Sequence, residues 1–251
     1  PELPCMRIII LLASLALAAC GGPATPLPPP DPTGSHITST DFVLLPCGPV
    51  TVPHPCVLVM AGGKRVLFGT PAGVATDMSL KHLRNLDAVM LFSLRGDDIE
   101  GLDDIRNASW RAGHETPLRV SGPVGTSEVL SAINKAYEVS DSFTFVEQAP
   151  AGGFNAASLR PLPGEKDTKT RVFDTGDLVV THLVNDTGRV GYWIDYNGVR
   201  LVLEPCGMTQ ATQFSGESRL TVACQNSTLT WPVTDLVFVD QRVAAKHTDA
   251  P

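Results

Sequence analysis

The sequence predicts a mixed α/β domain in which two β-sheets pack face to face and helices cover the outside. The 251 residues, 43% hydrophobic and 18% charged, have a composition typical of a packed globular domain. Strand-like and helix-like segments alternate through the first half of the chain, whereas short apolar runs separated by turn residues dominate the second half. Two successive halves of this kind favour two packed sheets with helices outside.

The first half predicts strands joined by Gly- and Pro-rich turns and by helices. The predicted strands are 41–45, 56–60, 64–68, 87–92 and 117–120, and the predicted helices are 78–85, 98–112 and 127–137. Segment 87–92 is apolar throughout, which is typical of a strand buried on both faces. Helix 127–137 has Thr126 or Ser127 as its expected cap and Glu128 in its first turn.

The second half predicts strands only. They are 143–146, 178–183, 191–196, 199–203 and 236–239. The dipeptide Asn197-Gly198 between two of these strands is typical of a two-residue hairpin turn.

The N-terminal region has the pattern of an export signal. Residues 6–19 place one arginine before a short apolar run, too short to span a bilayer comfortably. The sequence Leu17-Ala18-Ala19-Cys20 resembles the bacterial lipobox, which implies a lipid on Cys20; a plain secretory signal is the alternative. We therefore expect a signal region at 1–19, a lipidated cysteine and Pro-rich tether at 20–37, and one domain at 38–251.

This resemblance also implies a location and one partner. The expected site is the bacterial cell envelope, with the membrane as partner through the lipid anchor. Gly21 and Gly22 stand where an aspartate would signal retention in the inner membrane, so the analogy favours the outer membrane, facing the periplasm. The net charge of −7 and the absence of a basic run argue against a nucleic-acid partner.

Four cysteines remain in the expected mature domain: Cys47, Cys56, Cys206 and Cys224. An oxidising compartment permits disulfides between them, and four cysteines allow three pairings. The simplest pairs Cys47 with Cys56 and Cys206 with Cys224; the sequence alone leaves the choice open.

Residues 91–102, LFSLRGDDIEGL, resemble the metallo-β-lactamase superfamily, in which a buried strand leads into H-x-H-x-D-H and then a helix. Segment 67–73 is similar to that family's strand and Asp-Ala-Gly-like turn. Segments 110–126 and 182–198 are similar to the ribonuclease Z-like and arylsulfatase-like branch. The resemblance implies a four-layer αββα sandwich, here short at its C-terminal end, and a metal-dependent hydrolase ancestry.

The metal-binding positions depart from that family's pattern. Ser93, Arg95 and Asp98 occupy the three histidine positions, and Asp97 is the one residue of the signature that remains. Cys206 falls where the family has a bridging aspartate, Gly69 stands at the aspartate of the earlier turn, and His182 matches the fourth histidine. A guanidinium repels a metal cation, and we therefore expect Arg95 to form an ion pair with Asp97 and Asp98 in place of the metal.

Two functions follow as expectations. The first is a non-catalytic envelope lipoprotein, a pseudoenzyme without a metal cofactor, that binds an unknown ligand or protein partner or serves structurally. The second is a hydrolase of phosphodiesters or other esters with one zinc or other divalent ion. Its candidate ligands are Asp97, Asp98, His182 and Cys206. Function depends on the site rather than on the fold, so the fold does not decide between them.

Overall fold

Seven strands form the first of two β-sheets in the computed structural model, which describes residues 37–48, 56–206, 208, 218–224 and 228–239. All of these belong to one compact unit, Pro32–Pro251. The predicted signal region, Cys20 and most of the tether lie outside the described residues. In order across the sheet, the strands are β12 (Val237–Phe238), β1 (Val43–Pro46), β2 (Val57–Ala61), β3 (Lys64–Phe68), β4 (Ala88–Met90), β5 (Leu118–Ser121) and β6 (Leu159–Pro161).

The first sheet is antiparallel on one side of β3 and parallel on the other. Strands β1, β2 and β3 form an antiparallel meander, and β3 to β6 run parallel. Parallel neighbours need crossover connections, and helices fill these connections here. They are α1 (Val74–Asp77), α2 (Leu80–Arg84), α3 (Gly96–Ile99), α4 (Leu102–Arg111), α5 (Thr126–Gln148) and the short 3₁₀ helix η1 (Phe154–Ala157).

The second sheet has five strands. In order they are β11 (Leu220–Val222), β10 (Val199–Leu203), β9 (Val190–Tyr196), β8 (Leu178–Val184) and β7 (Lys169–Asp174). Strands β9 and β10 form the predicted hairpin. Its turn residues Asn197 and Gly198 have φ values of 49° and 75°, as a type I′ turn requires.

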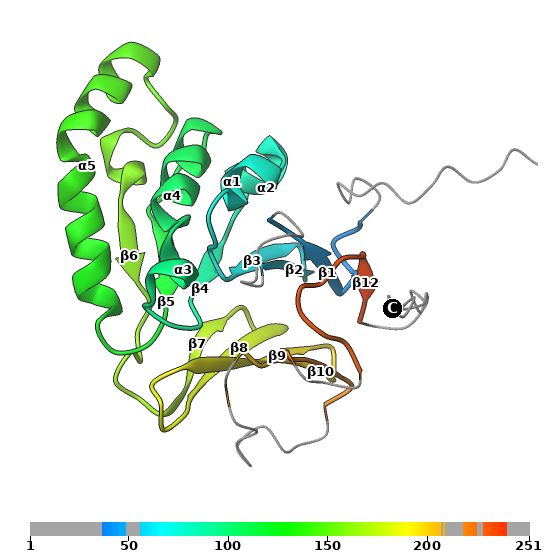
Figure 1. The fold of residues 1–251 in the computed structure, drawn as a ribbon. Helices are drawn as coiled ribbons and strands as arrows, with labels where there is room; N and C mark the ends of the chain where they lie inside the picture. The colour runs from blue at the N-terminus through cyan, green and yellow to red at the C-terminus, as the bar shows by residue number, and fades with distance from the viewer. Residues whose placement is uncertain (1–36, 49–55, 207, 209–217, 225–227, 240–251) are drawn as a thin grey trace, which may run out of the picture. The chain divides into compact units, whose positions relative to one another are not determined.

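Alternate residues of the first sheet enter two different cores. In β2, Val57 and Val59 join the cluster between the sheets, whereas Leu58 and Met60 join the cluster beneath the helices. A strand with apolar layers on both faces cannot alternate apolar with polar residues, which explains the continuous apolar runs of β2 and β4. Figure 1 shows α1, α2, α4 and α5 on one side of the first sheet and β7 to β10 on the other.

Tyr192 fixes the second sheet to the end of β4. Its side chain is fully buried, and its hydroxyl donates to the carbonyl oxygen of Leu91 at 2.7 Å. The backbone N–H of Val190 donates to Phe92 O at 2.8 Å, one residue further along. These two bonds give hydrogen-bond partners to the carbonyl oxygens of Leu91 and Phe92, the two residues that follow β4.

The predicted fold class is confirmed: two sheets pack together and helices cover the first. All helices of the described residues lie between β3 and β6 in the chain, so these residues supply three of the four expected layers. None of these helices combines the length and apolar character that crossing a membrane requires.

Two element predictions were wrong. Segment 143–146 is the last part of α5, not a strand, because its apolar residues lie on a helix surface that the domain leaves exposed. The helix predicted at 98–112 is divided into α3 and α4 at Gly101. This residue passes so close to the carbonyl oxygen of Pro71 that a Cβ would collide with it. Strands β6, β7 and β11 and helix α1 were not predicted.

Candidate functional site

The candidate site lies where the parallel strands β3 and β4 end. Gly69 and Thr70 follow β3, and Ser93 follows β4. The carboxyl ends of neighbouring parallel strands lie at the same edge of a sheet, which is where ligands bind in many α/β proteins. The segment from Ser93 to Asp98 connects β4 to α3 at this edge.

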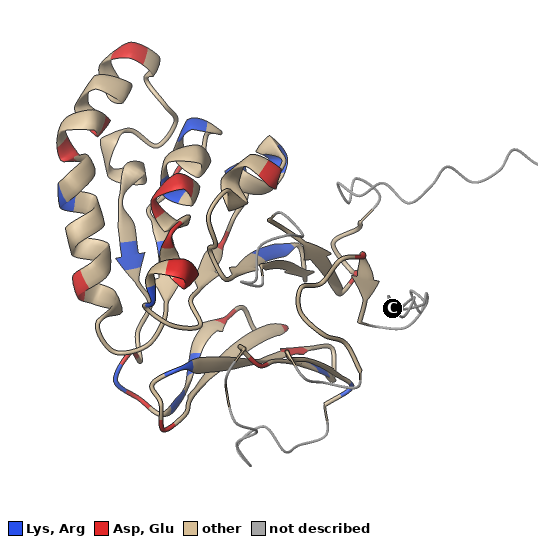
Figure 2. Ribbon diagram, in the orientation of Figure 1, with Lys and Arg blue, Asp and Glu red and all other residues tan. Residues whose placement is uncertain are grey.

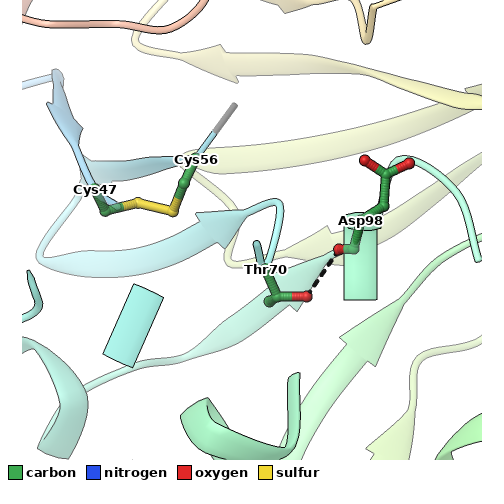
Figure 3. The surroundings of a disulfide bond; sticks show 4 residues. All are labelled: Cys47, Cys56, Thr70 and Asp98. Carbon is green, nitrogen blue, oxygen red and sulfur yellow. Dashed lines mark hydrogen bonds between the residues drawn. A yellow bond between two sulfur atoms is a disulfide. The ribbon is translucent and has the colours of Figure 1, made fainter. Parts of the chain in front are cut away.

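Ser93 and Asp98 join the two ends of this connection. The Ser93 hydroxyl is buried; it donates to the Asp98 carboxylate and accepts a hydrogen bond from the backbone N–H of Arg95 at 3.2 Å. The carbonyl oxygen of Asp98 accepts from the Thr70 hydroxyl at 3.1 Å and from its N–H at 3.4 Å. Figure 3 shows the Thr70 hydroxyl directed at that carbonyl. Hydrogen bonds within the connection, together with those from Thr70 after β3, therefore hold it in place.

Arg95 does not form the predicted ion pair. It occupies the N-cap of α3 with extended backbone, its side chain is exposed, and within the described residues it makes no ion pair with Asp97 or Asp98. Ser93 already bonds the Asp98 carboxylate, and an exposed pair with Asp97 would gain little in water. The prediction of an internal ion-pair cluster was wrong.

His182 lies on β8 and is fully buried. Its Nε2 is 2.8 Å from the carbonyl oxygen of Asp167, and since a carbonyl only accepts, Nε2 carries the proton. Nδ1 is buried and has no hydrogen-bond partner. Burial lowers the pKa of His182 below its ordinary value, against an opposing influence of Asp167, so the ring is neutral at neutral pH.

Cys206 forms a disulfide with Cys224, and Cys47 forms one with Cys56, with an S–S distance of 2.03 Å in the second bond. Of the three possible pairings, the structure has the one that closes the shorter loops. Figure 3 shows Cys47–Cys56. A sulfur atom in a disulfide is not a thiolate, the form in which cysteine binds zinc.

The residues at this edge do not fit the metal centre of the metallo-β-lactamase fold. A catalytic zinc needs about three protein ligands drawn from imidazole, carboxylate and thiolate groups. Here a hydroxyl, a guanidinium and an oxidised sulfur occupy three of the positions, and no group of three such side chains is arranged to hold a metal among the described residues. The unpaired Nδ1 of His182 is the remaining nitrogen donor of the fold's pattern.

Two residues of this edge were missed from sequence. Thr70 was overlooked because its role depends on Asp98, which is distant in sequence. Glu165, in the β6–β7 connection, binds the N-terminus of α5: it accepts from the N–H groups of Gly125 at 2.5 Å and Ser127 at 3.2 Å, and from the Ser127 hydroxyl. The signal for Glu165 was the turn Gly122-Pro123-Val124-Gly125, which leaves α5 without a side-chain cap of its own.

Glu165 remains ionised because these bonds favour the carboxylate. Partial burial raises its pKa, but the hydrogen bonds from the Ser127 hydroxyl and from the N–H groups of Gly125, Ser127 and Thr126 outweigh burial and lower the pKa below its ordinary value. The positive end of a long helix is thus occupied by a carboxylate from the same chain.

This arrangement, in which two sheets pack together and helices cover the outer face of the first sheet, is the metallo-β-lactamase fold. The human tRNase Z short form aligns with a TM-score of 0.51 at 16% identity, over 73% of this chain and 76% of that one. The metallo-β-lactamase fold protein YhfI of Bacillus subtilis aligns with a TM-score of 0.50 at 15% identity, over 72% and 70% of the two chains.

In sequence, the chain is similar to ribonuclease Z proteins. That of Mycobacterium marinum is 26% identical over 191 residues, which are 72% of this chain and 60% of the relative. That of Clostridioides difficile is 26% identical over 122 residues, 46% of this chain and 40% of the relative. The chain therefore spans 60% or less of the length of these curated relatives. No family model matches the sequence. The relatives support a hydrolase-like domain.

Proposed function

We propose that this protein is a lipid-anchored envelope protein whose hydrolase-like domain is non-catalytic and acts by binding a ligand or protein partner. The observation that carries the proposal is the bond between Ser93 and Asp98, at positions where the fold's signature has histidines. A carboxylate held by a neighbouring hydroxyl, beside an exposed arginine, closes the connection that would otherwise present metal ligands.

The disulfide supports the same conclusion. Cys206 lies after β10, where the fold has a bridging aspartate, and its bond to Cys224 withdraws the sulfur from metal binding. His182 alone cannot hold a catalytic zinc, which needs three protein ligands. The side chains at this edge therefore lack the means to generate hydroxide from a bound water at neutral pH.

A second candidate function is a metal-dependent hydrolase of phosphodiester or other ester substrates. It is favoured by the sequence similarity to ribonuclease Z and by the buried, unpaired Nδ1 of His182. Such an enzyme would use His182 together with Asp97, or with Asp98 after its bond to Ser93 opened.

Metal analysis separates the two functions. The full-length chain, purified without chelators from cells supplied with zinc and manganese, is analysed by inductively coupled plasma mass spectrometry and assayed with bis(p-nitrophenyl) phosphate. We expect substoichiometric metal and no turnover. Stoichiometric metal that is lost in His182→Ala but kept in His114→Ala would overturn the proposal. His114 is the matched control because it is also buried, with its ring nitrogens 2.6 and 2.7 Å from the carbonyl oxygens of Thr116 and Leu86.

The anchor is tested separately. When the chain is expressed in a bacterium with radioactive palmitate, we expect label on the protein, loss of label in Cys20→Ser, and unchanged label in Cys5→Ser. Fractionation of the two membranes then tests the proposed outer-membrane location. Label that persists in Cys20→Ser, or protein that is released unlabelled into the periplasm, contradicts the anchor.

A further inference from the structure

A pocket of about 410 Å³ lies at the edge of the first sheet opposite the candidate site, where β3, β4 and β5 begin. This amino-edge pocket is lined by residues 63–65, 84–87 and 113–116. Its lysine and arginines are Lys64, Arg65 and Arg84, and its carboxylates are Asp87 and Glu115. Figure 2 shows Lys and Arg in blue at the start of β3 and on α2. In a chain of net charge −7, such a pocket is a local departure towards positive charge.

Arg65 is oriented by a buried histidine. Its Nε donates to Nδ1 of His82 at 3.3 Å, and His82 is 3% exposed. This bond fixes the inner end of the guanidinium. Among the described residues, no carboxylate lies within ion-pairing distance of the Arg65 side chain. A guanidinium that is held at Nε and has no anion at its two outer nitrogens presents a pair of charged donors to a ligand.

The two carboxylates of the pocket do not supply the missing partner. Asp87 is fully used: Oδ1 accepts from Lys64 Nζ at 3.3 Å, and Oδ2 accepts from the backbone N–H of Arg65 at 2.9 Å. The Glu115 side chain is 67% exposed and lies 3.9 Å from Arg84, where an ion pair contributes little in water. The charge of Arg65 is therefore unbalanced, and that of Arg84 is balanced only weakly.

Arg84 is placed in the same pocket by its contact with Gly113. A Cβ on Gly113 would lie 3.6 Å from Nε and 3.8 Å from Cδ of Arg84, so the arginine lies across the turn that follows α4. His114, the next residue, is buried, and its ring nitrogens lie 2.6 and 2.7 Å from the carbonyl oxygens of Thr116 and Leu86. These contacts join the segment after α4 to the segment after α2, which fixes the wall of the pocket.

We propose that the amino-edge pocket binds a phosphate group through Arg65 and Arg84. The forked donors of arginine match the oxygens of a phosphate, and these charge-assisted hydrogen bonds are stronger than neutral ones. A tetrahedral phosphate presents oxygens in several directions and can therefore contact two guanidiniums from different segments of one pocket. A volume of about 410 Å³ is in the range of small-molecule sites and leaves room for the alcohol that the phosphate esterifies.

Two features favour a phospholipid headgroup as the source of this phosphate. A Cβ on Gly63 would lie 3.6 Å from Cβ of Ser39, so the predicted tether joins the domain beside the pocket. Leu80, which is 73% exposed, lies one helical turn before Arg84 on α2, so an apolar side chain projects next to the cations, as at a lipid interface. This choice of source rests on the proposed anchor at Cys20, whereas the phosphate site does not.

Isothermal titration calorimetry with glycerol 3-phosphate, on the full-length protein in a non-ionic detergent and a phosphate-free buffer, tests the site. We expect one bound molecule per chain and a roughly ten-fold or greater loss of affinity in Arg65→Gln and in Arg84→Gln. Glu115→Gln should bind more tightly, because it removes the carboxylate that competes for Arg84.

Arg160→Gln is the matched control and should bind with unchanged affinity. Arg160 is exposed on β6 and, like Arg65, has no carboxylate of the described residues within ion-pairing distance. An absence of saturable binding, affinity that is kept in both Arg65→Gln and Arg84→Gln, or an equal loss in Arg160→Gln overturns the inference.

Native mass spectrometry of the same detergent-solubilised protein distinguishes the two sources of phosphate. A lipid source predicts more bound phosphatidylglycerol than phosphatidylcholine, whose choline adds a cation next to the phosphate. It also predicts that Leu80→Ser binds less phosphatidylglycerol but keeps its affinity for glycerol 3-phosphate. Equal binding of the two lipids, with glycerol 3-phosphate binding intact, overturns the lipid source and supports a soluble phosphate ester. Failure of the palmitate labelling leaves the calorimetry unaffected, so the anchor and the phosphate site fail separately.

Discussion

Arg106 of α4 and Asp141 of α5 form an ion pair in the interior between the two helices. Their side chains are 2% and 6% exposed; Nη1 of the arginine lies 3.0 Å from Oδ1 of the aspartate, and Nη2 bonds Oδ2. The guanidinium also lies 5.1 Å from the centroid of the Tyr137 ring. This pair fixes α5 to the helical layer and sets which side of α5 is left exposed.

Removing one member of this pair is expected to be strongly destabilising. Asp141→Ala leaves an uncompensated guanidinium in the interior, and we expect a loss of about 3–5 kcal/mol in the free energy of unfolding, measured by urea denaturation. The double variant Arg106→Met/Asp141→Leu removes both charges and is expected to recover most of the loss. Glu138→Ala, which removes only the exposed pair with Lys135, is the control and should change stability by less than about 1 kcal/mol. A loss as small for Asp141→Ala as for the control contradicts the expectation.

The fold was largely predictable because local patterns and the buried core agreed. The apolar run of β4, the meander of β1 to β3 and the Asn197-Gly198 turn each have one simple interpretation, and the structure confirms them. Helix α5 was half missed for a physical reason. Phe143 and Val146 give the sequence a strand-like composition. In the structure this segment continues α5, and Asp141 lies on the inner side of the helix, where it pairs with Arg106.

The candidate site was predictable in position but not in its contacts. Ser93, Arg95 and Asp98 were singled out as departures from a known signature, yet the partner of Asp98 is Ser93 rather than Arg95. A sequence shows which charges are near one another along the chain, whereas solvent exposure decides whether they pair. Thr70 bonds a backbone carbonyl, which carries no residue-specific signal, and the turn before α5 indicates an uncapped helix start without identifying Glu165 as its partner.

Asn134 of α5 takes the place of a neighbouring strand at the outer edge of β6. Its amide nitrogen donates to the carbonyl oxygen of Leu159 at 2.9 Å, and its amide oxygen accepts from the Leu159 N–H at 2.8 Å. Leaving both groups of Leu159 without these partners is expected to cost about 1–3 kcal/mol in Asn134→Ala. Faster hydrogen exchange of the Leu159 amide would identify the cause, and Ser131→Ala, on an exposed position of the same helix, is the control. Unchanged exchange at Leu159 contradicts this role.

Tyr192 is expected to stabilise the contact between the sheets through its hydroxyl. In Tyr192→Phe the ring keeps its edge contacts with Phe68 and Phe92, at centroid distances of 5.1 and 5.7 Å, and loses the hydroxyl with its bond to Leu91 and its interaction with Ser121. We expect a loss of about 1–3 kcal/mol, because the carbonyl oxygen of Leu91 loses a buried partner. Tyr196→Phe, at a nearby buried position of the same strand, provides the comparison by thermal or urea unfolding. Equal stability of Tyr192→Phe and the parent protein would show that water replaces the hydroxyl.

Glu165 is expected to make the stability of the protein depend on pH. Its pKa is lower in the folded protein than in the unfolded chain, because Ser127 and the N-terminal N–H groups of α5 stabilise the carboxylate against the opposing effect of burial. A group with a lowered folded pKa contributes its stabilisation above the unfolded value, and this contribution is lost as pH falls through the folded value. Glu165→Gln should therefore be less stable than the parent at pH 7, by roughly 0.5–2 kcal/mol as for a lost helix cap, and the difference should vanish in acid below the ordinary glutamate range. Urea unfolding of both proteins at a series of pH values measures this difference.

Glu115→Gln, whose exposed carboxylate lies 3.9 Å from Arg84, is the matched control and should show almost no difference at any pH. A Glu165→Gln deficit that is constant from pH 7 into acid would mean that the side chain acts through packing rather than through its charge.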